Sequence, residues 1–260
     1  MAIDYIRNRF RFISEFKHWL RSVQRKHRLQ LQPTGTLDFG SLRRLRPVSR
    51  VFGLDRGLPI DRYYIENFLS AYSHDIKGHV LEIGDNYYTK KFGNNWVTKS
   101  DILHVVKGHP KATIVSDLTK ADNIYSNSFD CIIFTQTLQM IYDIHSAIKQ
   151  LHRILKPNGI LLVTTHGISK IGRREGKDNW GEYWHFTSQS IRKIFLNYFL
   201  TENVIIEVYG NVLAAISFLH GLASSELSKD ELDYLDPDYE VIISIKATKT
   251  EQDNQQVADI

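Results

Sequence analysis

The sequence predicts an α/β protein in which helices cover both faces of a mostly parallel, seven-stranded sheet, giving a three-layer sandwich. From residue 79 onward, short apolar runs alternate with helical patterns, the order typical of parallel strands joined by crossovers. Several runs end in glycine, acidic or amide residues, at the strand ends where parallel sheets bind ligands. The last two apolar runs can supply an antiparallel edge.

Each expected element has its own signals. Asp143 lies near the start of one helix, and Lys156-Pro157-Asn158-Gly159 ends it. Thr187 is the expected N-cap of the next helix. The expected strands are 79–83, 96–100, 112–116, 129–134, 159–165, 203–209 and 239–248, and the expected helices are 61–72, 143–155, 187–199 and 211–224.

Two connections between the expected strands are short. Only twelve residues separate Gly84 from Val97, near the minimum for a parallel crossover. The next connection contains Lys107-Gly108-His109-Pro110, which interrupts any helix there. We therefore expect little helix between the first three strands.

The charge of the chain is concentrated at its N-terminal end. Residues 1–50 contain twelve Lys or Arg and three Asp or Glu, a net charge of +9, whereas the whole chain carries +4. The other 210 residues therefore carry −5. This asymmetry indicates a surface for an anionic partner.

Residues 3–28 repeat apolar side chains every three or four positions, which predicts an amphipathic helix with a basic face. The helix has three interpretations. It packs on its own domain or on a protein partner, including a second copy in a homodimer. It lies in the plane of an anionic membrane, anchored by Phe12 and Trp19. It binds nucleic acid, which we do not expect because no recognisable reading module follows.

The chain divides into a basic helix and linker (1–57), a ligand-binding domain (58–250) and a disordered tail (251–260). A single cysteine, Cys131, excludes an intramolecular disulfide and fits a reducing compartment. No stretch approaches ~20 apolar residues, and the basic N-terminus does not fit a secretory signal. We therefore expect a cytoplasmic protein, with peripheral membrane contact as the alternative.

Acidic and amide residues mark the ends of four expected strands. Gly84 follows the first strand, and its missing Cβ lets a ligand approach the backbone. Asp101 closes the second expected strand, where a carboxylate can accept hydrogen bonds from ribose hydroxyls; a turn Asp is the alternative. Asp117 follows the third strand and Gln136 the fourth.

These segments, with Leu155-Lys-Pro-Asn-Gly-Ile-Leu-Leu-Val163, resemble class I S-adenosylmethionine (SAM) dependent methyltransferases, which have a Rossmann-like fold. The resemblance covers about residues 60–200. It departs from the family's glycine motif, because Asn86 and Tyr88 replace the second and third glycines.

The resemblance implies SAM as the cofactor and assigns parts of its binding site. Glu82, with Asp85 in the adjoining loop, is placed near the ammonium end of SAM, and Gln136 lies at the methyl-transfer centre. Asp117 and Leu118 are placed beside the adenine; a helix-capping Asp is the alternative for Asp117. Similar proteins fold a segment like Arg62 and Tyr63 over the cofactor, although an exposed helix face explains that pair equally well.

The acceptor side follows the fifth strand. His166 and His185 are candidate catalytic bases, because imidazole accepts protons near neutral pH; a structural histidine is the alternative. Tyr183 and Trp184 are candidate substrate contacts, or else a hydrophobic cover at the sheet edge. We predict no metal ligand.

The expected function is SAM-dependent O-methylation of a sugar, glycan or other small hydroxylated acceptor. The sets Arg46–Gly57, Asp61–Tyr64 and Tyr183–Thr187 resemble methyltransferase-domain proteins associated with bacterial glycan biosynthesis. Two alternatives are open. One is a catalytically silent scaffold that docks to a glycan-assembly enzyme, and the other is an N- or C-methyltransferase of a natural product.

Overall fold

The protein is described here by a computed structural model that covers residues 36–172 and 181–253. The helix expected at 3–28 lies outside the described residues. The chain forms two compact units, Met1–Leu45 and Arg46–Ile260. In the described part of the first unit, one 3-10 turn, η1 (Gly40–Leu42), is followed by Arg43, whose guanidinium lies 5.5 Å from the ring centroid of Phe39.

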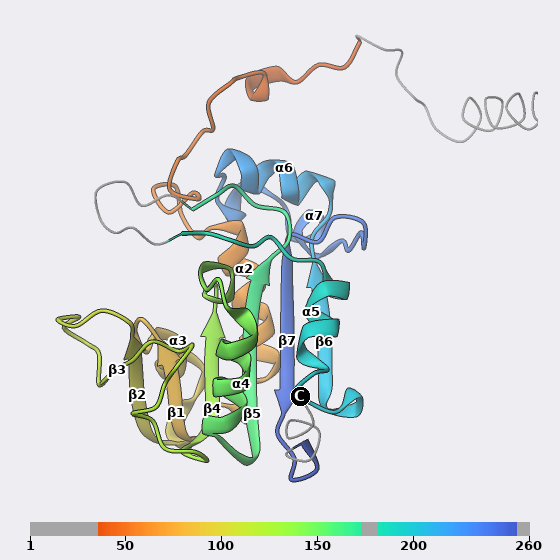
Figure 1. Ribbon diagram of the computed structural model, residues 1–260. Coiled ribbons are helices and arrows are strands. Elements are labelled where there is room, and N and C mark those ends of the chain that lie inside the picture. The colour runs from red at the N-terminus through yellow and green to blue at the C-terminus, as the bar shows by residue number, and fades with distance from the viewer. Residues whose placement is uncertain (1–35, 173–180, 254–260) are drawn as a thin grey trace, which may run out of the picture. The chain divides into compact units, whose positions relative to one another are not determined.

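The second unit contains one seven-stranded sheet in the order β3-β2-β1-β4-β5-β7-β6 (Figure 1). The five strands from β3 to β5 are parallel, whereas β7 runs antiparallel to both β5 and β6. The predicted Rossmann-like architecture with an antiparallel edge is therefore confirmed. The strands are β1 (Gly78–Ile83), β2 (Val97–His104), β3 (Ile114–Val115), β4 (Phe129–Thr135), β5 (Leu155–His166), β6 (Val204–Tyr209) and β7 (Ile242–Thr248).

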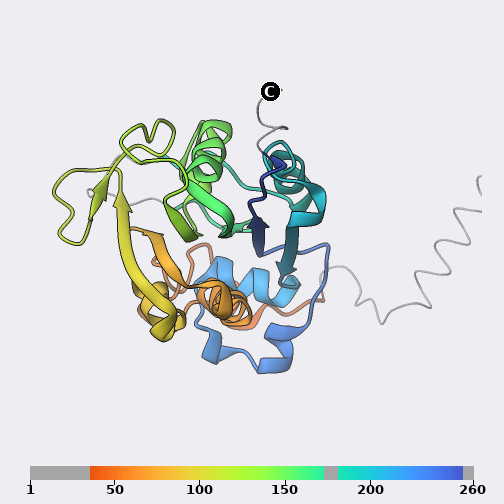
Figure 2. The same ribbon diagram turned by 90° about the horizontal axis from the view of Figure 1, so that it is seen from below.

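Helices cover both faces of the sheet (Figure 2). One face packs against α4 and α5, and the other packs against α2, α3 and α6. The alternation of strand side chains explains this, since Leu81 joins the first core and its neighbour Val80 the second. The helices are α2 (Ile60–Ala71), α3 (Tyr87–Phe92), α4 (Ile144–Ile154), α5 (Ser188–Phe195), α6 (Val212–His220) and α7 (Lys229–Asp233).

Local signals set most helix boundaries. The Asp143 side chain accepts a hydrogen bond from the Ser146 N–H at 3.0 Å and caps α4, as predicted. Thr187 caps α5 in a reciprocal pair with Ser190, also as predicted. The end of α4 differs, because β5 begins at Leu155 and the expected stop lies inside the strand.

The two short connections contain little regular structure. The first holds α3 and a 3-10 turn, η3 (Asn94–Trp96). The second, residues 105–113, has no helix, as the breakers in it indicate. Strand β2 is the main departure from expectation, since it continues to His104, four residues beyond its expected end. Ile102 and Leu103 are buried there and keep the strand within the core.

The first and the last described segments of the second unit pack onto its sheet. The Val48 and Ser49 N–H groups donate to the His220 carbonyl at 2.8 and 3.0 Å, so the last part of the expected linker belongs to this unit. Asp253 is buried and accepts a hydrogen bond from the Leu200 N–H at 2.9 Å. The remaining positions of the expected tail, 254–260, lie outside the described residues. Among the described helices, none has the length and hydropathy needed to span a membrane.

Candidate active site

The strand order creates a binding crevice between β1 and β4. The chain leaves β1 toward β2 on one side, whereas β4 continues toward β5 on the other, so crossovers diverge at this point. Ligands of parallel α/β sheets bind at the carboxyl ends of strands at such a switch point. Gly84 follows β1 with a φ of +83°, and a Cβ there would meet nothing within 4 Å. Open space therefore faces the backbone at the point where the sequence predicts a ligand.

Glu82 is buried and holds the start of α3. Its carboxylate accepts hydrogen bonds from the Tyr88 N–H at 3.1 Å, the Thr89 N–H at 2.8 Å and the Thr89 hydroxyl at 2.7 Å. Burial raises the pKa of Glu82 to about 7, although these donors act in the opposite direction. Asn86 and Tyr88 need no left-handed backbone, because one is the residue before α3 and the other lies inside that helix. The missing glycines are thus replaced by a short helix.

Arg62 reaches the same loop from α2. Its guanidinium donates to the Tyr88 hydroxyl at 2.5 Å and lies 5.6 Å from that ring's centroid. Asp85 lies close enough to raise the pKa of Arg62, in addition to the larger effects of burial, which lowers it, and of Tyr88, which raises it. Tyr63 does not join this group. Its hydroxyl donates to Asp233 Oδ1 at 2.6 Å, so this side chain is directed to α7, and its contact with the cofactor stays a prediction.

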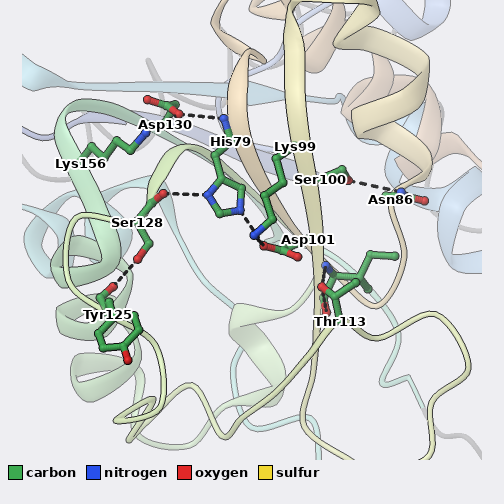
Figure 3. A network of polar contacts seen from close by, with 11 residues as sticks. His79, Asn86, Lys99, Ser100, Asp101, Thr113, Tyr125, Ser128, Asp130 and Lys156 are labelled. Atoms are coloured by element: carbon green, nitrogen blue, oxygen red, sulfur yellow. Dashed lines mark hydrogen bonds and ion pairs between the residues drawn. The ribbon is translucent and has the colours of Figure 1, made fainter.

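The structure also contradicts the position expected for Asp101. This residue pairs with Leu81 in the middle of the sheet and does not end β2. Its carboxylate lies 2.6 Å from His79 Nε2 and 2.9 Å from Lys99 Nζ (Figure 3). Burial raises the pKa of Asp101, but these contacts outweigh it and the net pKa is lowered. Asp101 therefore belongs to a network of hydrogen bonds and ion pairs that extends through His79 to the beginning of β1.

The carboxyl end of β2 is occupied by His104. Its ring stacks on that of His109, with centroids 4.2 Å apart and planes inclined by 16°. The acid that the family places at this strand end is thus replaced by an imidazole.

Asp117 and Leu118 lie two and three residues after the end of β3 but have different surroundings. Asp117 is exposed, and its Oδ1 accepts from the Thr119 N–H at 2.9 Å and from the Thr119 hydroxyl at 2.8 Å. Leu118 is buried in the core. A local turn, and not the helix cap that was the alternative, therefore accounts for one oxygen of Asp117, and its role beside the adenine stays a prediction.

Gln136 follows β4 in a left-handed conformation, with a φ of +47°. Its Oε1 accepts a hydrogen bond from Gln139 Nε2 at 3.1 Å, and Gln139 Oε1 accepts from the Thr165 hydroxyl at 3.1 Å. Gln136 Nε2 is buried and has no hydrogen-bond partner among the described residues. Such a donor is costly to bury unless a ligand satisfies it.

His166 and His185 meet at one carboxylate, that of Glu182. Glu182 Oε1 lies 2.8 Å from His166 Nε2 and 3.2 Å from His185 Nε2. Strand β5 ends at His166, and the segment carrying the other two is held against it by the bond from the Phe186 N–H to the His166 carbonyl at 3.3 Å. We call His166, Glu182 and His185 the acceptor triad.

Sequence reasoning missed two acids of this region. Glu182 was overlooked, although its spacing of three residues from His185 was a usable signal. Burial raises the pKa of Glu182, but the His166 side chain and the Gly172 N–H outweigh it and the net pKa is lowered. The second acid is Asp61, in the first turn of α2. Burial raises the pKa of Asp61, and the nearby charge of His166 acts in the opposite direction. Only the fold brings Asp61 to this end of the sheet.

The two aromatic candidates differ in exposure. Trp184 is partly buried; its Nε1–H donates to the Ile141 carbonyl at 3.0 Å and its ring packs on Tyr142 and Phe186. It therefore contributes to a hydrophobic cover at the sheet edge, and its contact with substrate stays a prediction. Tyr183 is exposed, with its ring centroid 5.4 Å from that of Tyr142, which is exposed as well.

Comparison with known proteins identifies the family. Residues 60–202 match the family model described as a methyltransferase domain. A probable polyketide synthase of Dictyostelium discoideum is 29% identical over 107 residues, which are 37% of this chain and 4% of that protein. This chain is therefore similar to a small part of that much longer relative.

Solved structures give further likenesses. A SAM-dependent methyltransferase from Archaeoglobus fulgidus is 10% identical, with 72% of this chain and 94% of that chain covered and a TM-score of 0.48. One from Mesorhizobium loti is 15% identical, with 76% and 100% covered and a TM-score of 0.47. Because the family model matches more than half of the chain, the protein belongs to the methyltransferase-domain family, whose cofactor is S-adenosylmethionine.

Proposed function

We propose that the protein transfers the methyl group of SAM to a hydroxyl oxygen of a small acceptor, with a sugar or glycan as the preferred class. The observation that carries this proposal is the acceptor triad beside Gln136, since His166 Nδ1 lies 3.3 Å from Gln136 Oε1. Two imidazoles and a carboxylate thus lie next to the strand ends that border the crevice. They suit an acceptor that must share or lose a proton as it is methylated.

The residues at the crevice suit the cofactor. Gly84 leaves room for the amino-acid tail, and Arg62 supplies a cation on the same side for its carboxylate. Gln136 Nε2 offers a buried donor that lacks a partner in the described residues. Asp117 and Leu118 would border the adenine. When bound, SAM supplies an electrophilic methyl group on a sulfonium.

The chain's own residues would position the acceptor. His166 and Glu182 form the buried floor of the triad, whereas the side chain of His185 is 39% exposed and reaches solvent. The exposed rings of Tyr183 and Tyr142 offer apolar faces of the kind that sugars pack on. Holding the two reactants in line supplies much of the acceleration of such a transfer.

Two measurements test this proposal. Calorimetric titration with SAM and with S-adenosylhomocysteine should give binding at one site per chain. Incubation with methyl-labelled SAM and a panel of glycosides, sugar nucleotides, phenols and amines should then label a hydroxylated member. If only amines or carbon acceptors are labelled, the methylated atom is nitrogen or carbon and the O-methylation proposal is wrong. Absence of SAM binding would refute the proposal as a whole.

One observation favours the silent scaffold as a second candidate. The ribose acid expected at the end of β2 is absent from that position, where His104 stands, and Asp101 is engaged with His79 and Lys99. A scaffold of this kind would show no turnover with any acceptor. The same labelling experiment therefore separates the two candidates.

A further inference from the structure

We propose that the acceptor triad, His166, Glu182 and His185, binds a divalent transition-metal ion, with Zn²⁺ as the reference ion. Two imidazoles and one carboxylate form a ligand set that proteins use for Zn²⁺ and other first-row divalent ions, with further coordination positions left open. The proposal concerns ion binding alone and does not depend on the methyl acceptor.

The distances within the triad suit a shared ion. One ligand atom from each residue can be chosen so that all three lie within 4.8 Å of one another. Glu182 Oε1 is 2.8 Å from one imidazole nitrogen and 3.2 Å from the other. Two ligands of a tetrahedral ion with bonds of about 2.0 Å lie about 3.3 Å apart. The two histidine–carboxylate distances come within about 0.5 Å of this spacing, whereas the two imidazole nitrogens, up to 4.8 Å apart, would have to move closer together to share the ion.

The contact between His166 and Glu182 is short without being a hydrogen bond. His166 Nε2 and Glu182 Oε1 are both buried, and neither has a hydrogen-bond partner within the described ranges. A ring N–H must point almost directly at its acceptor, which this pair does not achieve. If both atoms instead bind one ion, their lone pairs point toward the ion, and the ring nitrogen is not directed at the carboxylate oxygen. A cation between them would satisfy both.

A chain of hydrogen bonds prepares His166 to be a ligand. The Thr165 hydroxyl donates to Gln139, and Gln139 Nε2 donates to Gln136 Oε1, so this oxygen faces His166 Nδ1 as an acceptor. In the neutral imidazole, Nδ1 then carries the proton, which leaves the lone pair on Nε2, the nitrogen 2.8 Å from Glu182 Oε1. Metal-binding histidines are commonly oriented in this way by an acceptor on the other ring nitrogen.

Glu182 has its own support. Its second oxygen, Oε2, accepts a hydrogen bond from the Gly172 N–H, which leaves Oε1 directed to the two imidazoles. Nearby charges are mixed, because Lys170 is close enough to interact electrostatically with Glu182, and Asp61 with His166. The exposed His185 gives the ion a route from solvent, which a usable metal site requires.

The competing explanation is an imidazolium–carboxylate ion pair, in which a proton takes the place of the ion. Titration of the chelator-treated full chain with ZnCl₂, without SAM or acceptor, separates the two. We expect one tight site per chain by calorimetry, and with Co²⁺ an absorption spectrum typical of nitrogen and oxygen ligands. The substitutions E182Q and H185A should each weaken Zn²⁺ binding at least about 100-fold.

Two further variants make the test specific. Q136N introduces asparagine, which tolerates the left-handed backbone, but its shorter side chain cannot reach His166 Nδ1. Because His166 then loses the acceptor that orients it, Zn²⁺ affinity should fall about 10- to 100-fold. H74A removes an exposed histidine that also lies beside an acid, Asp75, and should change nothing. H185A removes an exposed side chain, so it tests the site even where E182Q fails to fold. Equal Zn²⁺ affinity in wild type, H185A and H74A would overturn the proposal.

Discussion

The two ends of the parallel sheet differ in how their polar groups are satisfied. At the end where the strands begin, both ring nitrogens of His79 are engaged, one by Asp101 at 2.6 Å and one by the Ser128 carbonyl at 3.0 Å. Asp130 accepts from the His79 N–H and from Lys156 Nζ, each at 2.8 Å (Figure 3). At the end where the strands finish, polar atoms of Gln136, His166 and Glu182 lack hydrogen-bond partners among the described residues.

This difference separates groups that stabilise the fold from groups that await a ligand. Buried polar atoms are normally paired. Of the seven buried side-chain atoms that lack a hydrogen-bond partner in the described residues, three belong to Gln136, His166 and Glu182, and this grouping needs an explanation. The crevice between β1 and β4 provides one, because its ligands would satisfy them. Residue type alone does not separate the two ends, since histidines and acids occur at both.

The largest expected effect comes from closing the open backbone at Gly84. We expect Gly84→Val to weaken SAM binding at least about 100-fold, since the new side chain would occupy the space that the ligand needs and would strain a backbone with a φ of +83°. Calorimetry measures the affinity. Gly40 is also left-handed and faces open space, but it lies in the first unit, so Gly40→Val serves as the control. Equal SAM affinity in Gly84→Val and wild type would remove Gly84 from the binding site.

The second effect belongs to the opposite end of the sheet. Asp101→Ala should lower the free energy of unfolding by about 2 kcal/mol, because charge-assisted hydrogen bonds to His79 and Lys99 are lost. SAM affinity should stay within twofold of wild type. The pKa of Asp101 is lowered in the folded state, so its contribution is complete above about pH 3.9, the unfolded value, and disappears as the pH falls through the folded value. Urea titrations at several pH values measure this, and a loss of SAM affinity would restore Asp101 to the cofactor site.

These two residues also show what the sequence can and cannot reveal. The succession of strands and helices along the chain follows from the alternation of apolar runs and turns, and Gly84 is found by its place after the first run. Asp101 was misplaced because the end of a strand depends on burial, and Ile102 and Leu103 extend β2 beyond it.

The acceptor triad shows a second limit. His166 could be found as a strand-end residue. Its contact with Glu182, which comes from a distant segment, is a property of the tertiary structure, as is the effect of its charge on Asp61. A hydrogen-bond partner such as Asp233 for Tyr63 is equally invisible in the sequence.

The third prediction concerns pH at the cofactor end. Burial raises the pKa of Glu82 to about 7, so its carboxylate becomes charged mainly between pH 6 and 8. We expect SAM affinity to rise about tenfold over that range, since a nearby negative charge attracts the ligand's ammonium group. The free energy of unfolding should change in the opposite direction: between about pH 4.5 and 7 the unfolded chain loses this proton first, so the folded state loses stability as pH rises. Glu82→Gln should abolish both trends, and a SAM affinity independent of pH in wild type would contradict the assignment.

The smallest effect tests whether the segment that carries the triad must be held in place. The Thr187 hydroxyl caps α5 two residues after His185, and Thr187→Ala should cost about 1 kcal/mol of stability. Because that cap also fixes the end of residues 182–186, Zn²⁺ affinity should fall two- to threefold. Ser228 caps a different helix, α7, with the same type of reciprocal pair and does not adjoin residues 182–186 in sequence, so Ser228→Ala should cost a similar free energy with no change in Zn²⁺ affinity. Equal Zn²⁺ affinities in the two variants would mean that packing of the aromatic segment, rather than the helix cap, positions His185 and Glu182.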